Sequence, residues 1–189
     1  MSRRMFSLAL LVAGMVAGSV RAADYQVDPV HTTLIYRIKH LQASYSYGRF
    51  NQVGGTFSYD PAAPEKTAFS MSVAAADIDS GNPQRDAHLK SPDFFNVKQF
   101  PVISFKSTSV KKAGDDKLEV TGDLTLHGVT KSVTTTLTVI GTAKGMAGET
   151  RTGFEGTLEL KRSDFGMNGL MPAVGDDVRL IVSIEGLYK

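Results

Sequence analysis

Apolar and polar residues alternate along most of the chain, which is the pattern of strands that bury one face. The clearest case is the segment 118–126, where Leu124 and Leu126 share a face with other apolar residues and Asp123 and Thr125 lie opposite. Successive strand side chains point to opposite faces, so the two leucines are predicted to point inward. Similar patterns occur in the segments 34–38, 56–59, 69–73, 102–110, 133–140, 154–160 and 178–187. They predict about eight strands, antiparallel where short turns join neighbours.

Helical signals are few. Asn82 can cap a helix and Pro83 suits its first position, so one short helix is predicted from there to Lys90, with a second turn in the segment 92–97. Because no helices alternate with the strands, a parallel α/β sheet is disfavoured. Gly122 interrupts an apolar strand face, which predicts a bulge or a sharp bend at that position.

Strand length favours a barrel over a two-sheet sandwich. Strands in sheets are typically about five or six residues long, and the segments 118–127 and 178–188 are longer. Long strands suit the wall of a barrel, in which strands are tilted. Closure also removes sheet edges. The predicted fold class is therefore all-β: an eight-stranded antiparallel barrel with one or two short helices. Such a barrel is just wide enough to be filled by side chains or to hold one small ligand.

The first 22 residues have the features of an export signal. Arg3 and Arg4 precede the apolar run 8–16, and small residues lead up to Ala22. The run is shorter than the roughly 20 residues of a membrane span, so we predict a signal peptide over 1–22 that is cleaved, and no stable membrane anchor. Residues 23–189 are then expected to form one domain, free in the periplasm.

Composition argues against several classes of function. The sequence has no Cys, so neither a disulfide nor a lipidated thiol is expected. The formal net charge of +2 includes the arginines of the leader, and no basic cluster points to nucleic acid. The glycines do not form a phosphate-binding loop, and no Gly-x-Ser-x-Gly elbow supports a catalytic triad.

The four histidines do not have the spacing of a zinc site. They fall in different predicted elements, at His31, His40, His88 and His127. A metal site would require folding to bring them together, for example with Asp28 or Asp86. Hydrogen bonding at strand ends is the other interpretation, and no metal or cofactor is expected.

Seven short strings carry a more specific signal. They are Val27-Asp28-Pro29-x-His31, Arg85-Asp86-x-His88-Leu89, Ser91-Pro92-Asp93-Phe94-Phe95, Phe100-Pro101-x-Ile103-x-Phe105-x-Ser107, Gly122-x-Leu124-Thr125-Leu126-His127-Gly128-Val129-Thr130-Lys131, Arg162-Ser163-Asp164-Phe165-Gly166 and Val174-Gly175-Asp176-x-Val178. In that order and spacing they closely resemble the YceI family of bacterial periplasmic proteins, over essentially the whole mature chain. Two departures are Thr32, where Ser is common, and Tyr45-Ser46-Tyr47, which replaces a more aliphatic stretch and bears on the pocket mouth.

The resemblance implies a lipocalin-like barrel whose apolar interior binds polyisoprenoid, quinone-like or fatty amide molecules. It also implies frequent homodimers and no shared catalytic triad, so a binding or carrier protein is expected rather than an enzyme. Within the helical region, Arg85 and Asp86 are expected to hold the helix through hydrogen bonds to turns. The aromatic residues that follow are expected to plug one barrel end: Phe94, Phe95 and Phe100.

The ligand site can be predicted by combining the resemblance with the strand phases. Apolar phases of separate strands must face one interior if the sheet closes. The tunnel wall is therefore predicted to include Tyr36, Ile38, Phe57, Met71, Phe105, Leu124 and Leu126. Loop-borne Phe and Met adjust to tails of different shape, which places near the mouth Phe94, Phe165, Met167 and Met171.

Two other functions stay open. One is a metal- or His/Asp-dependent hydrolase that acts on an apolar substrate. The other is a structural, stress-related barrel whose interior is filled by these same residues, because aromatic and Met side chains more often form plain core than a ligand pocket.

Overall fold

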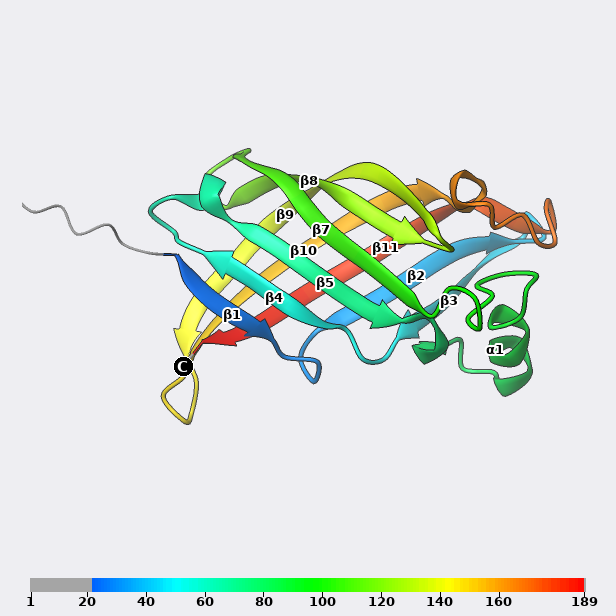
Figure 1. Ribbon diagram of the computed structural model, residues 1–189, viewed down its shortest axis with the longest axis horizontal. Coiled ribbons are helices and arrows are strands. Elements are labelled where there is room, and N and C mark those ends of the chain that lie inside the picture. The colour runs from blue at the N-terminus through cyan, green and yellow to red at the C-terminus, as the bar shows by residue number, and fades with distance from the viewer. Residues whose placement is uncertain (1–21, 189) are drawn as a thin grey trace, which may run out of the picture.

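The computed structural model describes residues 22–188, and their strands form one antiparallel sheet curled into a barrel (Figure 1). The strands are β1 (Ala23–Val27), β2 (Thr33–His40), β3 (Ser44–Phe50), β4 (Gly54–Tyr59), β5 (Ala68–Ala74), β6 (Ile78–Asp79), β7 (Val102–Lys112), β8 (Lys117–Leu126), β9 (Val129–Lys144), β10 (Thr150–Lys161) and β11 (Val174–Tyr188). The helical elements are α1 (Pro83–Leu89) and the 3-10 turns η1 (Pro64–Lys66), η2 (Ala75–Asp77) and η3 (Arg162–Phe165).

The six strands β1 to β6 form three long barrel strands, each divided in two. β11 pairs with β1 near its end, where Val27 lies opposite Gly186, and with β2 nearer its start, where Ile38 lies opposite Val178. β1 and β2 thus form one divided strand. The next is formed by β4, which pairs with β1, and β3, which pairs with β2. The third is formed by β5, which pairs with β4, and β6, which pairs with β3. Counting each divided strand once gives an eight-stranded up-and-down barrel, closed where β1 and β2 meet β11. The predicted fold class is confirmed.

The half of the barrel away from α1 is filled by aromatic side chains. Phe154 is fully buried and meets the rings of Phe57, Tyr59 and Phe69 edge-on, with centroids 5.2, 5.3 and 5.2 Å away. Edge-to-face contacts of this kind are favourable beyond the area they bury. The Phe57 ring lies over Gly186, where a Cβ atom would approach it to 2.3 Å. This half of the barrel therefore has a packed core.

At the other end, α1 covers one side of the barrel mouth (Figure 1). Asn82 caps the helix by accepting a hydrogen bond from Arg85 N at 3.0 Å, and Pro83 occupies its first turn. Asp86 accepts hydrogen bonds from Ser80 N and Oγ at 2.8 and 2.5 Å, and Arg85 Nη2 donates to Ser80 O at 2.5 Å. The prediction that Arg85 and Asp86 hold the helix is confirmed.

The bulge predicted at Gly122 of β8 lies instead in the neighbouring strand β7. The β7–β8 ladder is irregular at Thr108, between Ser107 and Ser109, and not at Gly122 itself. A Cβ atom at Gly122 would come within 2.5 Å of the Phe105 ring, so the glycine makes room for an aromatic side chain of the neighbouring strand.

The structure bears only in part on the predicted leader and on membrane association. The signal peptide predicted over 1–22 lies outside the described residues, except for Ala22. Within residues 22–188, no helix is both long enough and apolar enough to cross a bilayer.

Candidate functional site

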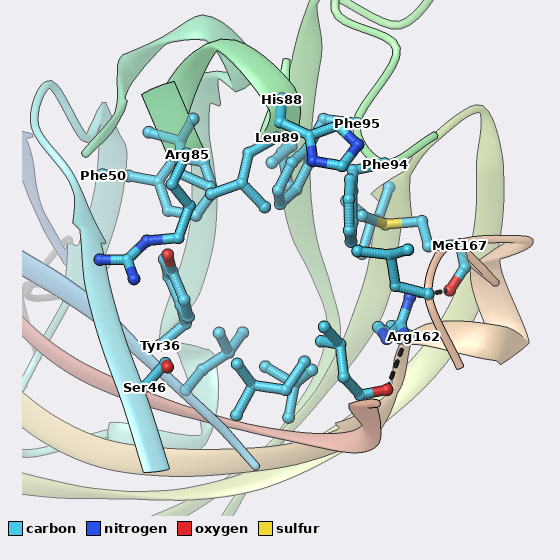
Figure 2. A pocket seen from close by; sticks show the side chains of 18 of the residues that line it. Tyr36, Ser46, Phe50, Arg85, His88, Leu89, Phe94, Phe95, Arg162 and Met167 are labelled. Carbon is cyan, nitrogen blue, oxygen red and sulfur yellow. Dashed lines mark hydrogen bonds between the residues drawn. The ribbon is translucent and has the colours of Figure 1, made fainter. Parts of the chain in front are cut away.

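A cavity of about 580 Å³ occupies the half of the barrel that α1 covers (Figure 2). This volume lies within the usual range of small-molecule sites, about 300–1,000 Å³. Most of its lining is apolar and comes from the inner faces of the strands, among them Leu34, Phe50, Ile103, Leu160, Val178 and Leu180. The polar lining is Lys39, His40, Ser46, Asn82, Gln84, Arg85, His88 and Arg162. The cavity is therefore an apolar space with a polar border.

The structure brings about half of the predicted ligand residues to this cavity. Those that line it are Tyr36, Ile38, Phe94, Leu124, Leu126 and Met167. Leu124 and Leu126 are buried, whereas Asp123 is exposed, so the predicted orientation of β8 is confirmed. Those that do not line it are Phe57, Met71, Phe105, Phe165 and Met171.

The five other residues lie elsewhere because strand phase does not fix the level along the barrel. Phe57 belongs to the filled half, where it stacks on Tyr25 with ring centroids 4.8 Å apart. Met71 and Phe105, paired across β5 and β7, pack against both the filled half and the cavity walls. Phe165 is buried in the wall, and Met171 is 43% exposed.

The expected aromatic plug is only partly formed. Phe94 and Phe95 line the cavity beside α1. Phe100 instead packs on the His127 ring with centroids 4.6 Å apart, and a Cβ atom at Gly128 would come within 2.5 Å of it. Phe100 therefore supports the β8–β9 turn.

Arg162 borders the cavity although it is only 3% exposed. Its Nε, Nη1 and Nη2 atoms donate to the main-chain carbonyls of Gly175, Met167 and Val174 at 2.7, 2.7 and 2.9 Å. These bonds tie η3 to the start of β11. Burial lowers the pKa of the guanidinium, and the Asp176 carboxylate opposes this, but an arginine remains charged. Strand periodicity gave no signal for this side chain.

Tyr36 and Ser46 place hydroxyl groups on the cavity side of β2 and β3. Tyr36 lies opposite Gly48 in the ladder, and Ser46 lies opposite Ile38. Tyr45 and Tyr47, the neighbours of Ser46, are about half exposed, so only the serine of this departure from the family pattern reaches the cavity. Burial is the main cause that raises the pKa of Tyr36; the Arg85 charge opposes it, and the charges of Asp86 and Asp79 add to it. The phenol therefore stays protonated at neutral pH and can donate.

Away from the cavity, Asp28, His31 and Glu185 form the one group of possible metal ligands found in residues 22–188, with ligand atoms within 4.8 Å. His31 Nδ1 and Asp28 Oδ2 are 2.7 Å apart. Arg151 Nη1 donates to Asp28 Oδ2 at 3.0 Å and to Glu185 Oε1 at 2.5 Å. Because the arginine and the imidazole already engage these oxygens, the geometry is that of an ion-pair network joining β1, β10 and β11.

Two other histidines also make structural contacts. His88 Nε2 lies 2.9 Å from Asp93 Oδ2, on the loop that follows α1. His127 Nδ1 lies 3.1 Å from the Phe165 carbonyl and donates to it, which links the β8–β9 turn to η3. These contacts agree with hydrogen bonding at the ends of elements.

An eight-stranded up-and-down barrel with an apolar cavity at one end belongs to the lipocalin-like class of barrels. More specifically, the chain belongs to the YceI family: the model of the YceI-like domain matches residues 25–186. The UPF0312 protein of Azotobacter vinelandii is 39% identical over 191 residues, which cover 100% of both chains.

Two solved structures are similar in fold. BcnA of Burkholderia cenocepacia matches with a TM-score of 0.77 and 25% identity, over 84% of this chain and 98% of that chain. A polyisoprenoid binding domain from Saccharophagus degradans matches with a TM-score of 0.70 over 89% and 100% of the two chains; at 15% identity it shows the shared fold alone.

Proposed function

We propose that this protein binds an apolar or amphiphilic small molecule inside the barrel and carries or sequesters it in the periplasm. The observation that carries the proposal is the cavity of about 580 Å³ with its apolar strand lining. The polyisoprenoid binding domain of similar fold supports an isoprenoid or another lipid as the kind of ligand.

The energetics of burial favour such binding. A water-sized group takes up about 30 Å³, so the cavity has room for roughly twenty chain atoms. Burying each methylene contributes about 0.8 kcal/mol, which gives a gross gain of about 15 kcal/mol for such a tail. Ordering of the chain and loss of its free motion offset much of this gain. An apolar ligand can therefore bind tightly without the polar groups of a catalytic site.

Extraction of the purified protein with organic solvent, followed by mass spectrometry, tests this function. We expect about one lipid molecule per chain. A bound metal ion without lipid would favour the hydrolase instead, and neither lipid nor metal would favour a barrel with no ligand. Metal content is measured on the same preparation, so one sample separates the three functions.

The location in the cell is a separate part of the proposal. It rests on the charged, apolar and small residues of the segment 1–22. The protein recovered from the periplasm should begin at Ala23, and a chain that begins at Met1 there would contradict cleavage. A homodimer also stays a prediction, which light scattering of the mature protein would measure.

A further inference from the structure

The border of the cavity carries positive charge and no negative charge. Lys39, Arg85 and Arg162 are cationic, and none of the described lining residues is Asp or Glu. Charge of one sign around the opening of an apolar space attracts a ligand group of opposite sign. The lining therefore suits an anionic head group better than a neutral or cationic one.

The two arginines are not neutralised by ion pairs. Arg162 donates to three main-chain carbonyls, and Arg85 donates to that of Ser80. Within residues 22–188, neither guanidinium forms a salt bridge with a carboxylate at 4.0 Å or less. A peptide carbonyl has only a partial charge, so both side chains keep positive charge that a ligand can use.

Acidic residues of the surrounding elements are engaged with other groups. Asp86 accepts two hydrogen bonds from Ser80, and Asp93 pairs with His88. Asp176 accepts from Ser163 N and Oγ at 2.9 and 2.8 Å, and acts on Arg162 only through space. These carboxylates do not line the cavity, although the charges of Asp86 and Asp79 reach Tyr36 from behind the wall.

Two hydroxyl groups on the cavity side have no hydrogen-bond partner among the residues that the structure describes. Among residues 22–188, Tyr36 Oη and Ser46 Oγ form no hydrogen bond, although both side chains line the cavity. Figure 2 shows the Tyr36 hydroxyl pointing to the side of the opening where the Arg85 guanidinium lies. A charged donor and a neutral donor on the same side of an opening are groups that can hold a carboxylate or a phosphate.

We propose that the ligand is a single-chain amphiphile with an anionic oxygen head group, held by Arg85 and Tyr36, whose tail lies in the apolar cavity. The inference rests on the proposed function and specifies the ligand class for the same cavity. Room for roughly twenty chain atoms fits a tail of about sixteen to eighteen carbons. A carboxylate and a phosphate share the required chemistry.

The test compares four ligands that have the same tail and different heads. Protein stripped of lipid is loaded with Nile red, and the dye is displaced by hexadecanoate, hexadecyl phosphate, hexadecanol or hexadecylamine. We expect at least one anion to bind about tenfold to a hundredfold more tightly than hexadecanol, because hydrogen bonds to charged groups are the stronger ones, and the amine to bind most weakly. The ratio of the two anions then identifies the carboxylate or the phosphate as the natural head.

Variants of Arg85 separate binding of the head group from support of the helix. Arg85→Gln should remove most of the preference for the anion and leave hexadecanol affinity unchanged, and Arg85→Lys should restore part of it. Arg179→Gln is the matched control, because Arg179 pairs with Glu159 on another face. An Arg85→Gln variant that weakens hexadecanoate and hexadecanol equally would show a structural role only and overturn the inference.

The two levels of the proposal can fail separately. Equal affinity of the unaltered protein for hexadecanol and both anions would overturn the anionic head group but leave an apolar carrier. Failure of all four amphiphiles to displace the dye would overturn the proposed function itself.

Discussion

The Tyr36 ring lies over Gly48 on the neighbouring strand, where a Cβ atom would come within 2.3 Å of Tyr36 Oη. The two residues are direct partners in the β2–β3 ladder and face the barrel interior. The glycine is therefore needed for its small size, since any larger residue would push the ring toward the cavity. This contact sets the position of the phenol at the cavity wall.

Replacing Gly48 should affect ligand binding in the cavity more than the stability of the fold. In Gly48→Ala, the new methyl group displaces a movable ring end, so we expect weaker ligand binding with a loss of stability of about 1 kcal/mol. Gly54→Ala is the matched control, because nothing lies within 4 Å of a Cβ atom there. Dye displacement and thermal unfolding of both variants measure the two effects. Unchanged affinity in Gly48→Ala would contradict this role of the ring.

Leu126 tests the register of β8. Its side chain is 8% exposed, so Leu126→Asp would place an unpaired charge inside the barrel and should destabilise it by about 3 kcal/mol or more. Thr125→Asp puts the same side chain on the opposite face, where Thr125 bonds to Thr130, and should cost far less. Chemical unfolding compares the two; equal stability losses would argue against the register.

The alternation of residues predicts which face of a strand a side chain occupies, but not its level along the barrel. That is why Tyr36, Ile38 and Leu124 line the cavity and Phe57 does not, although one pattern predicted the same tunnel for all of them. All four residues lie on the apolar face of their strands, but Phe57 lies among the rings around Phe154. The division into a filled half and a hollow half depends on contacts between distant strands, which local sequence does not encode.

The charged border of the cavity could not be predicted from the sequence for a similar reason. Arg162 lies outside the alternating pattern of the strands, and its buried guanidinium donates to one carbonyl after η3 and to two at the start of β11. The site around Asp28 was partly visible, since His31 lies three residues away in the chain. Glu185 and Arg151 reach it only through the closure of the barrel.

Asp28 should make the stability depend on pH in the acid range. Its hydrogen bond to His31 is the largest cause that lowers its pKa, from 3.8 to about 2, with help from Val30 N and Arg151 and against the effect of burial. A carboxylate with a lowered pKa in the folded state stabilises fully above the unfolded value near 3.8, and this contribution is lost as the pH falls toward 2.

Unfolding experiments between pH 2 and pH 5 measure this dependence. Asp28→Asn should be less stable than the unaltered protein at pH 5, and the difference should shrink as the pH falls toward 2. Asp115→Asn removes a carboxylate from an exposed turn and controls for the change in net charge. A stability difference that stays constant over the range would exclude this linkage.

The ligand is tested most directly by filling the cavity from within. Leu124 lines the cavity and is 6% exposed, so Leu124→Trp should occupy space that a tail needs and reduce the extracted lipid severalfold, while the barrel still folds. Ile140→Trp introduces the same side chain on the outside, where Ile140 is 62% exposed, and should retain the lipid. His31→Ala and His127→Ala should retain it as well, because neither residue lines the cavity. Mass spectrometry of the extracts, with circular dichroism to check the fold, gives the comparison. Lipid kept by Leu124→Trp and lost from His31→Ala would move the binding site to the Asp28 cluster and favour polar or metal chemistry.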